Sequence, residues 1–279
     1  MAIPDFLVIG HVAKDVDDES WRLGGTAAYA SLQAARLGLR AAIITRAASD
    51  IEFERLLPGV DALNVSSETT TVFQNRYENG RRVQRAWSQA GPIGAEHVPQ
   101  EWRSARMVLL GPLLRETPIE MTRLFSNGLV GVCPQGWLRD RRPDGQVVRR
   151  AWSELLRGVD LVFVSDEDIG DQKGVLEVWS RQARIVVVTE SRHGARISVE
   201  GRWRHIAAFP HNEVDPTGAG DVFAAAFMIA FDETQDVAQA ARFAVAAAGL
   251  SVEGEGAAAV PGREAIERAL AEHPEVVLK

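Results

Sequence analysis

The sequence contains a single cysteine, Cys133, and therefore forms no internal disulfide, which favours a reducing compartment. No apolar run approaches the length of a membrane span, and residues 1–10 carry no basic segment ahead of their apolar stretch. The 38 acidic side chains outnumber the 31 basic ones, and the net charge of −7 disfavours general binding to nucleic acid backbones. These absences predict a cytoplasmic globular protein with neither a membrane nor a nucleic acid as partner.

Signatures of several enzyme classes are also missing. The sequence has no G-x-x-x-x-G-K-S/T phosphate loop, no G-x-G-x-x-G between a strand and a helix, and no G-x-S-x-G around a serine. Its six histidines show no metal-ligand spacing, and one cysteine cannot support a zinc cluster. P-loop enzymes, dinucleotide-dependent enzymes, nucleophile-elbow hydrolases and zinc enzymes all lose support.

What the sequence does contain is enough apolar material for a sizeable core, 46% of the residues. Short β-rich apolar runs alternate with helix-like segments, which is typical of an α/β fold with a mostly parallel, doubly wound sheet and helices on both faces. No linker or repeat divides the chain, so we predict one domain over residues 1–279. The predicted strands are 6–10, 41–45, 107–110, 129–133, 161–164 and 185–188, and the predicted helices are 24–37, 219–231, 236–251 and 262–271.

Two stretches alternate apolar and polar residues instead. Residues 69–87 do so around Asn79-Gly80, a strong hairpin signal, and residues 195–208 predict a second hairpin. A hairpin inserted early in a parallel fold suits a small β lid over the edge of the sheet, and an ordinary surface excursion fits the pattern as well. The exposed edge of such a hairpin also allows a homodimer through the lid.

The segment Asp215-Pro-Thr-Gly-Ala-Gly-Asp221 opens the apolar helix 219–231. Its glycines, Gly218 and Gly220, let the backbone turn sharply, so that N–H groups at the positive end of the helix form an anion site. Asp221 is placed to take a proton from a hydroxyl while the amides stabilise a transferring phosphoryl group. A cap that only balances the helix dipole is the alternative, and the apolar helix behind the turn favours function.

This segment resembles the D-T-x-G-A-G-D signature of the ribokinase-like (PfkB) carbohydrate kinase family. Further elements of the family follow in the same order over most of the chain. They are the first strand 6–10, Asp15, the pair Gly24-Gly25 opening a helix that ends in Leu37-Gly38, the turn with Thr189, Gly194 and Ala195, and the closing element with Gly256-Ala257 and Pro261.

The resemblance implies a ribokinase-like fold and a kinase that uses ATP and Mg²⁺ to phosphorylate a hydroxyl of a small sugar or polyol. It implies that Asp221 is the general base, that Gly218, Ala219 and Gly220 hold the γ-phosphate, and that the hairpin at 69–87 is a lid that excludes water. By the same resemblance, the substrate-binding residues are Asp15, Gly24 and Gly25, and the nucleotide-binding residues are Thr189, Gly194, Thr217 and Gly256.

The sequence also departs from the family pattern. Tyr29 stands where the family usually has Asn, Ser191 replaces a turn glycine, and Val245 stands where many members have Asn. The family motif N-x-x-E, which orders magnesium through water, is here Ser165-Asp-Glu-Asp168, so the metal role falls to Asp168 on a shorter arm. The catalytic centre is intact, whereas substrate and metal details are altered.

Residues 70–73 and 135–139, among others, resemble the inositol-kinase-like members of the family. Within the second segment, Gln135 and Arg139 are candidates to bind a polyol or a phosphate, although ordinary loop groups at the end of a strand fit slightly better. The arginine-rich stretch 139–150 fits a solvated loop better than a patch that steers an anionic substrate.

Three functions remain. The first is an ATP- and Mg²⁺-dependent kinase of a small sugar or polyol, with inositol-like acceptors favoured. The second is a nucleoside kinase on the same fold, for which Tyr29 would supply an aromatic clamp for the base. The third is a nucleotide- or sugar-binding sensor without turnover, supported by Tyr29, Ser165 and Val245 and opposed by Asp221, because a pure binder needs no base.

Overall fold

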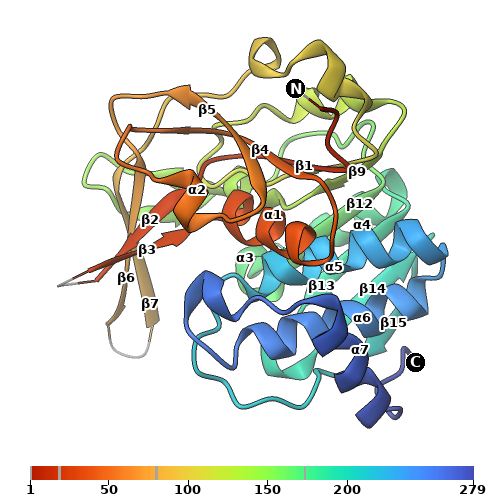
Figure 1. Ribbon diagram of the computed structural model, residues 1–279. Helices are drawn as coiled ribbons and strands as arrows, with labels where there is room; N and C mark the ends of the chain where they lie inside the picture. The colour runs from red at the N-terminus through yellow and green to blue at the C-terminus, as the bar shows by residue number, and fades with distance from the viewer. Residues whose placement is uncertain (1, 18–19, 79–80, 173) are drawn as a thin grey trace.

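The computed structural model describes residues 2–17, 20–78, 81–172 and 174–279. A nine-stranded sheet runs through the molecule in the order β15-β14-β13-β12-β9-β8-β1-β4-β5 (Figure 1). Its strands from β13 to β5 are parallel, whereas β14 and β15 are added antiparallel at one edge. The bounds are β1 (Phe6–Ile9), β4 (Ala41–Ala47), β5 (Val60–Ser66), β8 (Met107–Leu110), β9 (Leu129–Val132), β12 (Leu161–Ser165), β13 (Ile185–Thr189), β14 (Ala195–Val199) and β15 (Arg202–Ile206).

The parallel strands are continuous apolar runs because both faces of the sheet are covered. In β1, Phe6 and Val8 point into one hydrophobic core, and Leu7 and Ile9 point into the other. The six predicted strands are all present, and the predicted α/β fold with a mostly parallel sheet is confirmed. The sequence did not reveal β5, an edge strand whose residues are all at least partly exposed.

Helices cover both faces of this sheet, but unequally (Figure 1). One core contains the long helices α1, α5, α6 and α7, and the other contains α4 and several short 3₁₀ turns. The four predicted helices correspond to α1, α5, α6 and α7. The α-helices are α1 (Thr26–Arg36), α2 (Phe53–Leu56), α3 (Asp166–Ile169), α4 (Gly174–Gln182), α5 (Ala219–Thr234), α6 (Val237–Ser251) and α7 (Arg263–Glu272), and the 3₁₀ helices are η1 (Ala95–His97), η2 (Gln100–Ser104), η3 (Ile119–Phe125), η4 (Pro134–Leu138), η5 (Ser191–His193) and η6 (Gly256–Ala259).

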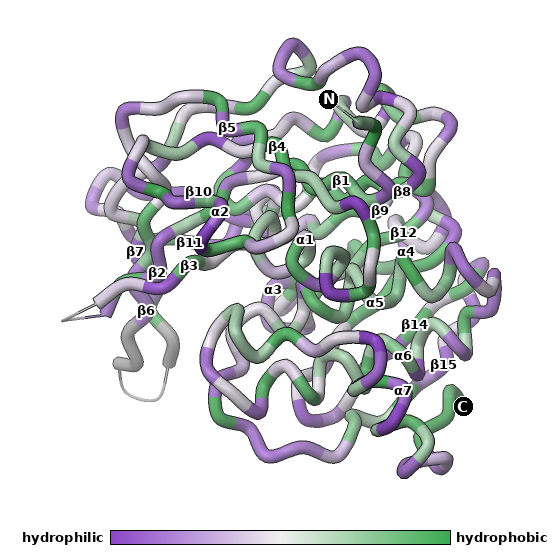
Figure 2. Tube along the Cα trace, viewed as in Figure 1, coloured by the Kyte–Doolittle hydropathy of each residue, from purple (hydrophilic) through white to green (hydrophobic). Residues whose placement is uncertain are grey.

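Helix α5 contributes the longest run of buried helical residues to the first core. Every residue from Val222 to Phe231 is buried, and the segment is continuously apolar (Figure 2). Phe227 stacks between Phe223 and Phe231, with ring centroids 6.1 and 6.2 Å away, and meets Phe163 of β12 edge-on at 5.6 Å. These contacts fix α5 against the sheet and thereby fix where its N-terminus lies.

A second, four-stranded sheet has the order β3-β2-β6-β7, and we call it the lid sheet. Its strands are β2 (Ala13–Val16), β3 (Trp21–Gly24), β6 (Thr71–Glu78) and β7 (Arg81–Ser88). Strands β6 and β7 pair antiparallel where the alternating pattern predicts a hairpin, and Asn79-Gly80 at its expected turn lies outside the described residues. Strands β2 and β3 escaped prediction, because they are short, partly exposed and contain charged residues, and so lack the continuous apolar run that revealed β1, β8 and β9.

The arginine-rich stretch is a third piece of β structure; it is solvated at residues 141–144, as the sequence favoured, but it forms a hairpin and not a loop. Strands β10 (Arg139–Arg141) and β11 (Val147–Arg149) form a hairpin that lies against β7. Ala86 of β7 donates its N–H to Gly145 O at 2.8 Å, and Arg141 Nε donates to Ala86 O at 2.6 Å. The edge of β7 expected to be free is therefore partly covered, and the homodimer through the lid stays a prediction.

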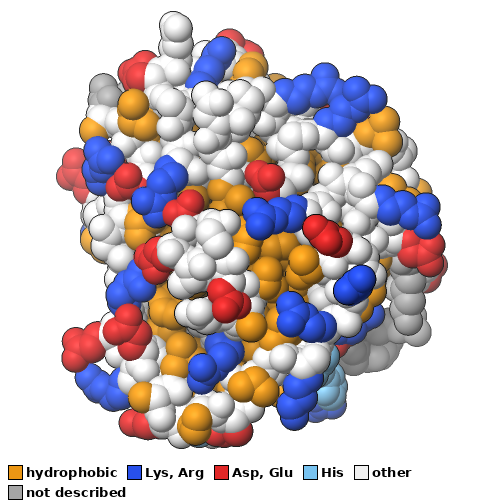
Figure 3. All heavy atoms as spheres, turned by 90° about the vertical axis from the view of Figure 1, so that its right-hand side faces the viewer, with side chains coloured by type: hydrophobic (Ala, Val, Ile, Leu, Met, Phe, Trp, Pro, Cys, Tyr) orange, Lys and Arg blue, Asp and Glu red, His pale blue; other side chains and the backbone are white. Residues whose placement is uncertain are grey.

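The surface mixes charges of both signs. On the face shown in Figure 3, Lys and Arg side chains are interspersed with Asp and Glu, and hydrophobic side chains lie between them. Within the described residues, no helix combines the length and the apolar character needed to cross a membrane.

Replacing Phe227 by Ala should lower the free energy of unfolding by about 3–5 kcal/mol, because the fully buried ring leaves a cavity that the stacked neighbours cannot fill. Urea unfolding followed by circular dichroism measures the change. The control is Leu155→Ala, at a side chain that is 57% exposed, and it should change stability by no more than about 0.5 kcal/mol. Equal losses in the two variants would contradict the packing described for α5.

Candidate active site

The N-terminus of α5 is built around a left-handed glycine. Gly218, with φ of +79°, is the N-cap, and its carbonyl accepts the N–H groups of Asp221 and Val222. A Cβ at this position would lie 2.3 Å from the ring of Tyr29. Both the backbone angle and the ring contact therefore require glycine here, which explains the first glycine of the motif. The turn places Asp221 in the first turn of the helix, at its positive end.

The carboxyl group of Asp221 has a raised pKa. Burial is the main cause that raises its pKa to about 6, and the nearby charges of Asp168 and Asp15 add to the rise. A hydrogen bond from Thr26 and the charge of Arg139 act in the opposite direction. A carboxylate with a pKa just below neutral is poised to take up a proton at physiological pH.

The Gly24-Gly25 pair brings the lid sheet to this point. A Cβ on Gly24 would lie 2.0 Å from Asp15 Oδ2, so the missing side chain is what leaves room for the carboxylate of Asp15 on β2. Gly25, with φ of +93°, is the N-cap of α1, and a Cβ there would meet His11 O at 2.7 Å. The pair thus starts α1 directly beside Asp15, and Asp15 lies near enough to Asp221 to affect its pKa.

A third carboxylate, Asp168, follows β12 and is held by three side chains. Its Oδ1 accepts a hydrogen bond from Arg139 Nη2 at 2.6 Å, and its Oδ2 accepts one from Ser165 Oγ at 2.6 Å. Gln135 Nε2 lies 3.3 and 3.1 Å from the two oxygens. Burial alone would raise the pKa of Asp168, but Arg139 and these hydrogen bonds outweigh burial and lower it. Asp168 therefore carries its negative charge close to Asp221, whose raised pKa leaves it partly protonated near neutral pH.

The predicted nucleotide residues form two groups. In the first group, the carboxylate of Asp215 accepts the backbone N–H groups of Thr217 at 3.0 Å and of Gly256 at 3.1 Å, and so holds these two residues together. The same carboxylate forms an ion pair with Arg22 of β3 at 3.1 Å. Thr189 and Gly194 lie at the adjoining end of β13 and the start of β14, where Gly194 has φ of +95°. Each group lies where a strand or helix of the main sheet layer meets a turn.

The departures from the family pattern occupy defined structural positions. Tyr29 is only 2% exposed and packs against Gly218, so its ring offers no face for a nucleobase, and the expected aromatic clamp is wrong. Ser165 caps α3 by accepting Asp168 N–H at 3.0 Å, and Val245 is buried in α6. Ser191 keeps a positive φ of +48°, a backbone region that favours the glycine it replaces.

Two side chains that sequence reasoning missed also reach the site. Thr26 hydrogen-bonds to Asp221, and Gln84 Oε1 on β7 accepts a hydrogen bond from Arg139 Nη1 at 3.2 Å. The position of Thr26 directly after Gly24-Gly25 could have marked it as a residue of the site. Gln84 gave none, because it is one of several polar residues in an alternating strand.

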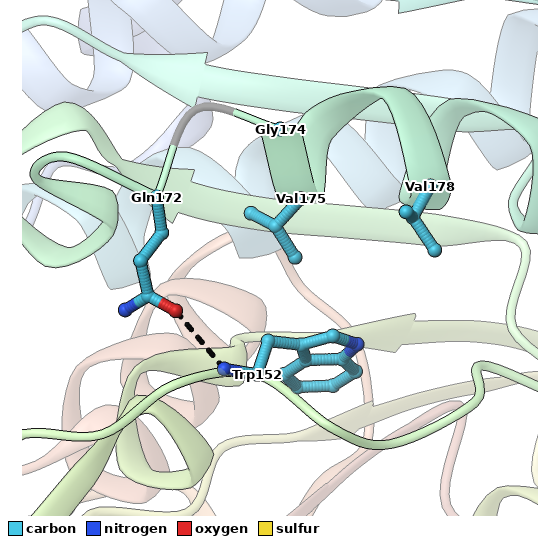
Figure 4. A pocket seen from close by; sticks show the side chains of 5 residues that line it. All are labelled: Trp152, Gln172, Gly174, Val175 and Val178. Carbon is cyan, nitrogen blue, oxygen red and sulfur yellow. Dashed lines mark hydrogen bonds between the residues drawn. The ribbon is translucent and has the colours of Figure 1, made fainter.

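A hollow of about 270 Å³ lies between α4 and the segment before β12 (Figure 4). Val175 and Val178 point toward the Trp152 ring, and Gln172 Oε1 accepts the backbone N–H of Trp152 at 3.0 Å. Gly174 completes the lining. None of these residues belongs to the group of carboxylates, so this hollow is separate from the candidate active site.

Comparison with known proteins gives concordant similarities. A family model described as pfkB family carbohydrate kinase matches residues 107–263, more than half of the chain. The nucleoside kinase of Methanothermobacter thermautotrophicus is 30% identical over 253 residues, which cover 84% of this chain and 79% of that protein.

Two solved structures share the fold. A pyrophosphate-dependent kinase in the ribokinase family, complexed with a pyrophosphate analog and myo-inositol, superposes with a TM-score of 0.78 at 22% identity over 95% of this chain and 99% of that one. The ribokinase of Arabidopsis thaliana, complexed with ribose and ATP, has a TM-score of 0.71 at 19% identity over 96% of this chain and 99% of that one.

The turn geometry predicts opposite effects on stability for alanine at two glycines, Gly218 and Gly220, which lie two residues apart. Gly218→Ala should lower the free energy of unfolding by about 2 kcal/mol or more, because alanine is disfavoured at positive φ and its Cβ would press on Tyr29. Gly220→Ala, where a Cβ meets nothing within 4 Å, should be neutral or stabilising by up to about 1 kcal/mol. Urea unfolding distinguishes them, and a Gly218→Ala variant as stable as the wild type would contradict the left-handed turn.

The raised pKa of Asp221 makes a prediction for stability against pH. Between the ordinary value of 3.8 and the folded value of about 6 the folded state binds more protons, so Asp221 makes stability fall as pH rises through this window. Asp221→Asn removes the buried charge and should stabilise the protein by about 1–3 kcal/mol at pH 7.5. The gain should disappear below about pH 4. Asp61→Asn, at an exposed position on β5, should show no such pH-dependent gain, and an Asp221→Asn gain that is equal at both pH values would contradict the assignment.

Proposed function

The chain belongs to the pfkB family of carbohydrate kinases, and on that premise we propose that it transfers the γ-phosphoryl group of ATP, with Mg²⁺, to a hydroxyl of a small sugar or polyol, with inositol-like polyols favoured. Membership makes the protein a phosphotransferase. In this proposal residues 1–279 form one kinase domain, and the lid sheet closes over the acceptor.

The observation that carries the proposal is the meeting of Asp221, its glycine turn and Asp15. Asp221 and the turn at Gly218 lie at the N-terminus of α5, while Asp15 comes from the lid sheet and influences the pKa of Asp221. A base, an anion-binding turn and a second carboxylate on the acceptor side are the parts that transfer to an alcohol requires.

The reaction uses these groups in sequence. Asp221 accepts the proton of the acceptor hydroxyl while the hydroxyl oxygen forms a bond to the γ-phosphorus. The bond from that phosphorus to the oxygen that bridges it to the β-phosphate breaks, and ADP leaves. The N–H groups at Gly218, Ala219 and Gly220, at the positive end of α5, stabilise the charge on the transferring group. Asp15 accepts hydrogen bonds from neighbouring hydroxyls, and Gly24 and Gly25 allow the acceptor to approach the backbone.

The residues fit a Mg²⁺ ion that arrives on the donor. Among the described residues no group of three or more His, Cys, Asp or Glu side chains is arranged to hold a metal, and Asp168 already accepts hydrogen bonds from three side chains. Mg²⁺ commonly keeps several waters and binds through one or two carboxylates plus substrate phosphates. Asp168 would then hold the ion through water, and the ion would neutralise charge on the phosphates.

The donor side is assigned to the turns at Thr189 and Gly194 and to the pair Thr217 and Gly256. Asp215 gives that pair its fixed geometry by bonding both N–H groups. A donor phosphate chain running from these turns toward Gly218 would end beside Asp221. Pyrophosphate is the donor of a protein with the same fold, so it is a necessary second donor in the test.

A hydroxyl-rich acceptor suits the site better than a nucleoside. Asp15, Gln135 and Arg139 offer polar groups that can bind several hydroxyls, whereas Tyr29 is buried and offers no stacking face. The nucleoside kinase remains the second candidate because of the 30% identity to a nucleoside kinase. A sensor without turnover is less favoured, since it would have no use for a carboxylate whose pKa is near 6.

The test is ADP release from ATP and Mg²⁺ with purified protein and a panel of inositols, sugars and nucleosides, repeated with pyrophosphate as donor and phosphate release as the readout. One acceptor class should stimulate turnover, inositols before the others. Asp221→Asn should lower kcat by at least about 10²-fold and leave ATP affinity near that of the wild type, because it removes only the base.

The control is Asp61→Asn, which removes an exposed carboxylate of β5 and should retain full activity. Near-normal turnover by Asp221→Asn would refute its role as base. Stimulation by nucleosides alone would replace the polyol by the second candidate, and ATP binding without stimulation by any acceptor would shift support to the sensor.

A further inference from the structure

The side chain of Gln84 links the lid sheet to the cluster around Asp168. Its Oε1 accepts a hydrogen bond from Arg139 Nη1 at 3.2 Å, and its Nε2 donates to Asn75 Oδ1 at 3.0 Å. Asn75 is the direct cross-strand partner of Gln84 between β6 and β7. Because a guanidinium only donates, these two contacts fix the orientation of the amide, with its oxygen toward Arg139.

Arg139 carries this contact on to the carboxylates. Its Nη2 donates to Asp168 Oδ1 at 2.6 Å, and the two side chains are only 15% and 11% exposed. The same cation also lowers the pKa of Asp221. One guanidinium therefore bridges a lid strand and the pair of acids at the reaction centre.

Two further hydrogen bonds tie the same elements together. Strand β10 begins at Arg139, and two residues later Arg141 Nε donates to Ala86 O of β7 at 2.6 Å. Ala86 N–H in turn donates to Gly145 O at 2.8 Å. Strand β7 thus holds both the backbone hairpin that carries Arg139 and, through Gln84, its guanidinium.

We propose that Gln84 is a positioning residue that acts through Arg139: it holds the guanidinium between the lid sheet and Asp168, and does not itself bind the acceptor. The inference rests on the proposed phosphoryl transfer, which it deepens by linking the position of the lid to the charge beside Asp221. Removing the oxygen of Gln84 leaves Arg139 with one fixed partner in place of two.

A double-mutant cycle on kcat/KM tests the link, using the acceptor that supports turnover in the wild type. Gln84→Leu should lower kcat/KM about tenfold, and Arg139→Ala should lower it about a hundredfold. In the Arg139→Ala background, Gln84→Leu should have no further effect, because its target is gone. Gln84→Glu keeps an acceptor oxygen for Arg139 and should retain most of the activity that Gln84→Leu loses.

The matched control is Gln146→Leu. Gln146 Oε1 also accepts from an arginine, Arg142 at 2.9 Å, but within the β10–β11 hairpin and away from Asp168, so its loss should leave kcat/KM unchanged. Effects of Gln84→Leu and Arg139→Ala that multiply in the double variant would overturn the proposal, since Gln84 would then act independently, for instance on the acceptor. An unaffected Gln84→Leu enzyme would overturn it as well.

Urea unfolding of the wild type, Gln84→Leu, Arg139→Ala and the double variant tests the contact without any substrate. If Gln84 and Arg139 interact, the shift of the urea midpoint in the double variant should be smaller than the sum of the two single shifts. Additive shifts would overturn the proposal whatever the activity. A wild-type protein that phosphorylates nothing, yet shows coupled midpoints, would instead count against the proposed function and leave the Gln84–Arg139 contact standing.

Discussion

The site depends on holding one carboxylate, that of Asp221, largely withdrawn from water at the N-terminal turn of α5. Burial raises its pKa to about 6, and the protein limits the cost of this charge with the positive end of the helix, the Thr26 hydroxyl and the cation of Arg139. Helix α5 can impose this position because its residues from Val222 to Phe231 are all buried. A helix packed on every side along this run cannot shift easily, so core packing fixes where the carboxyl group of Asp221 lies.

Two neighbouring carboxylates are driven to opposite behaviour by their surroundings. Burial dominates at Asp221 and raises its pKa, whereas Arg139, Ser165 and Gln135 overcome burial at Asp168 and lower its pKa. Pairs of acids whose pKa values are pushed apart in this way divide proton transfer and charge compensation between them. The negative charge of Asp168 also favours the protonated form of Asp221, so the contacts that keep Asp168 ionised raise the pKa of Asp221.

Close approach explains why glycines recur around these acids. A side chain at Gly24 would collide with Asp15, and one at Gly218 would collide with Tyr29. The first glycine lets the lid sheet bring its carboxylate beside α1, and the second lets the turn before α5 lie against that same helix. The buried Tyr29 thereby becomes part of the support of the turn before α5, although the family usually has a smaller polar residue there.

The sequence by itself determined the main sheet apart from its edge strand β5, the long helices and the turn at Asp215 to Asp221. Continuous apolar runs, helical periodicity and glycine spacing are local properties, and they are legible without knowing which segments meet. Only the tertiary structure decided that β2 and β3 join the hairpin strands, that Tyr29 is buried, that Gln135 and Arg139 hold Asp168, and that the arginine-rich stretch folds against β7. Gln84 and Arg139 are 55 residues apart in the chain, and their contact exists because two sheets bring them together. Contacts of this kind depend on long-range geometry, and the pattern of neighbouring residues does not encode them.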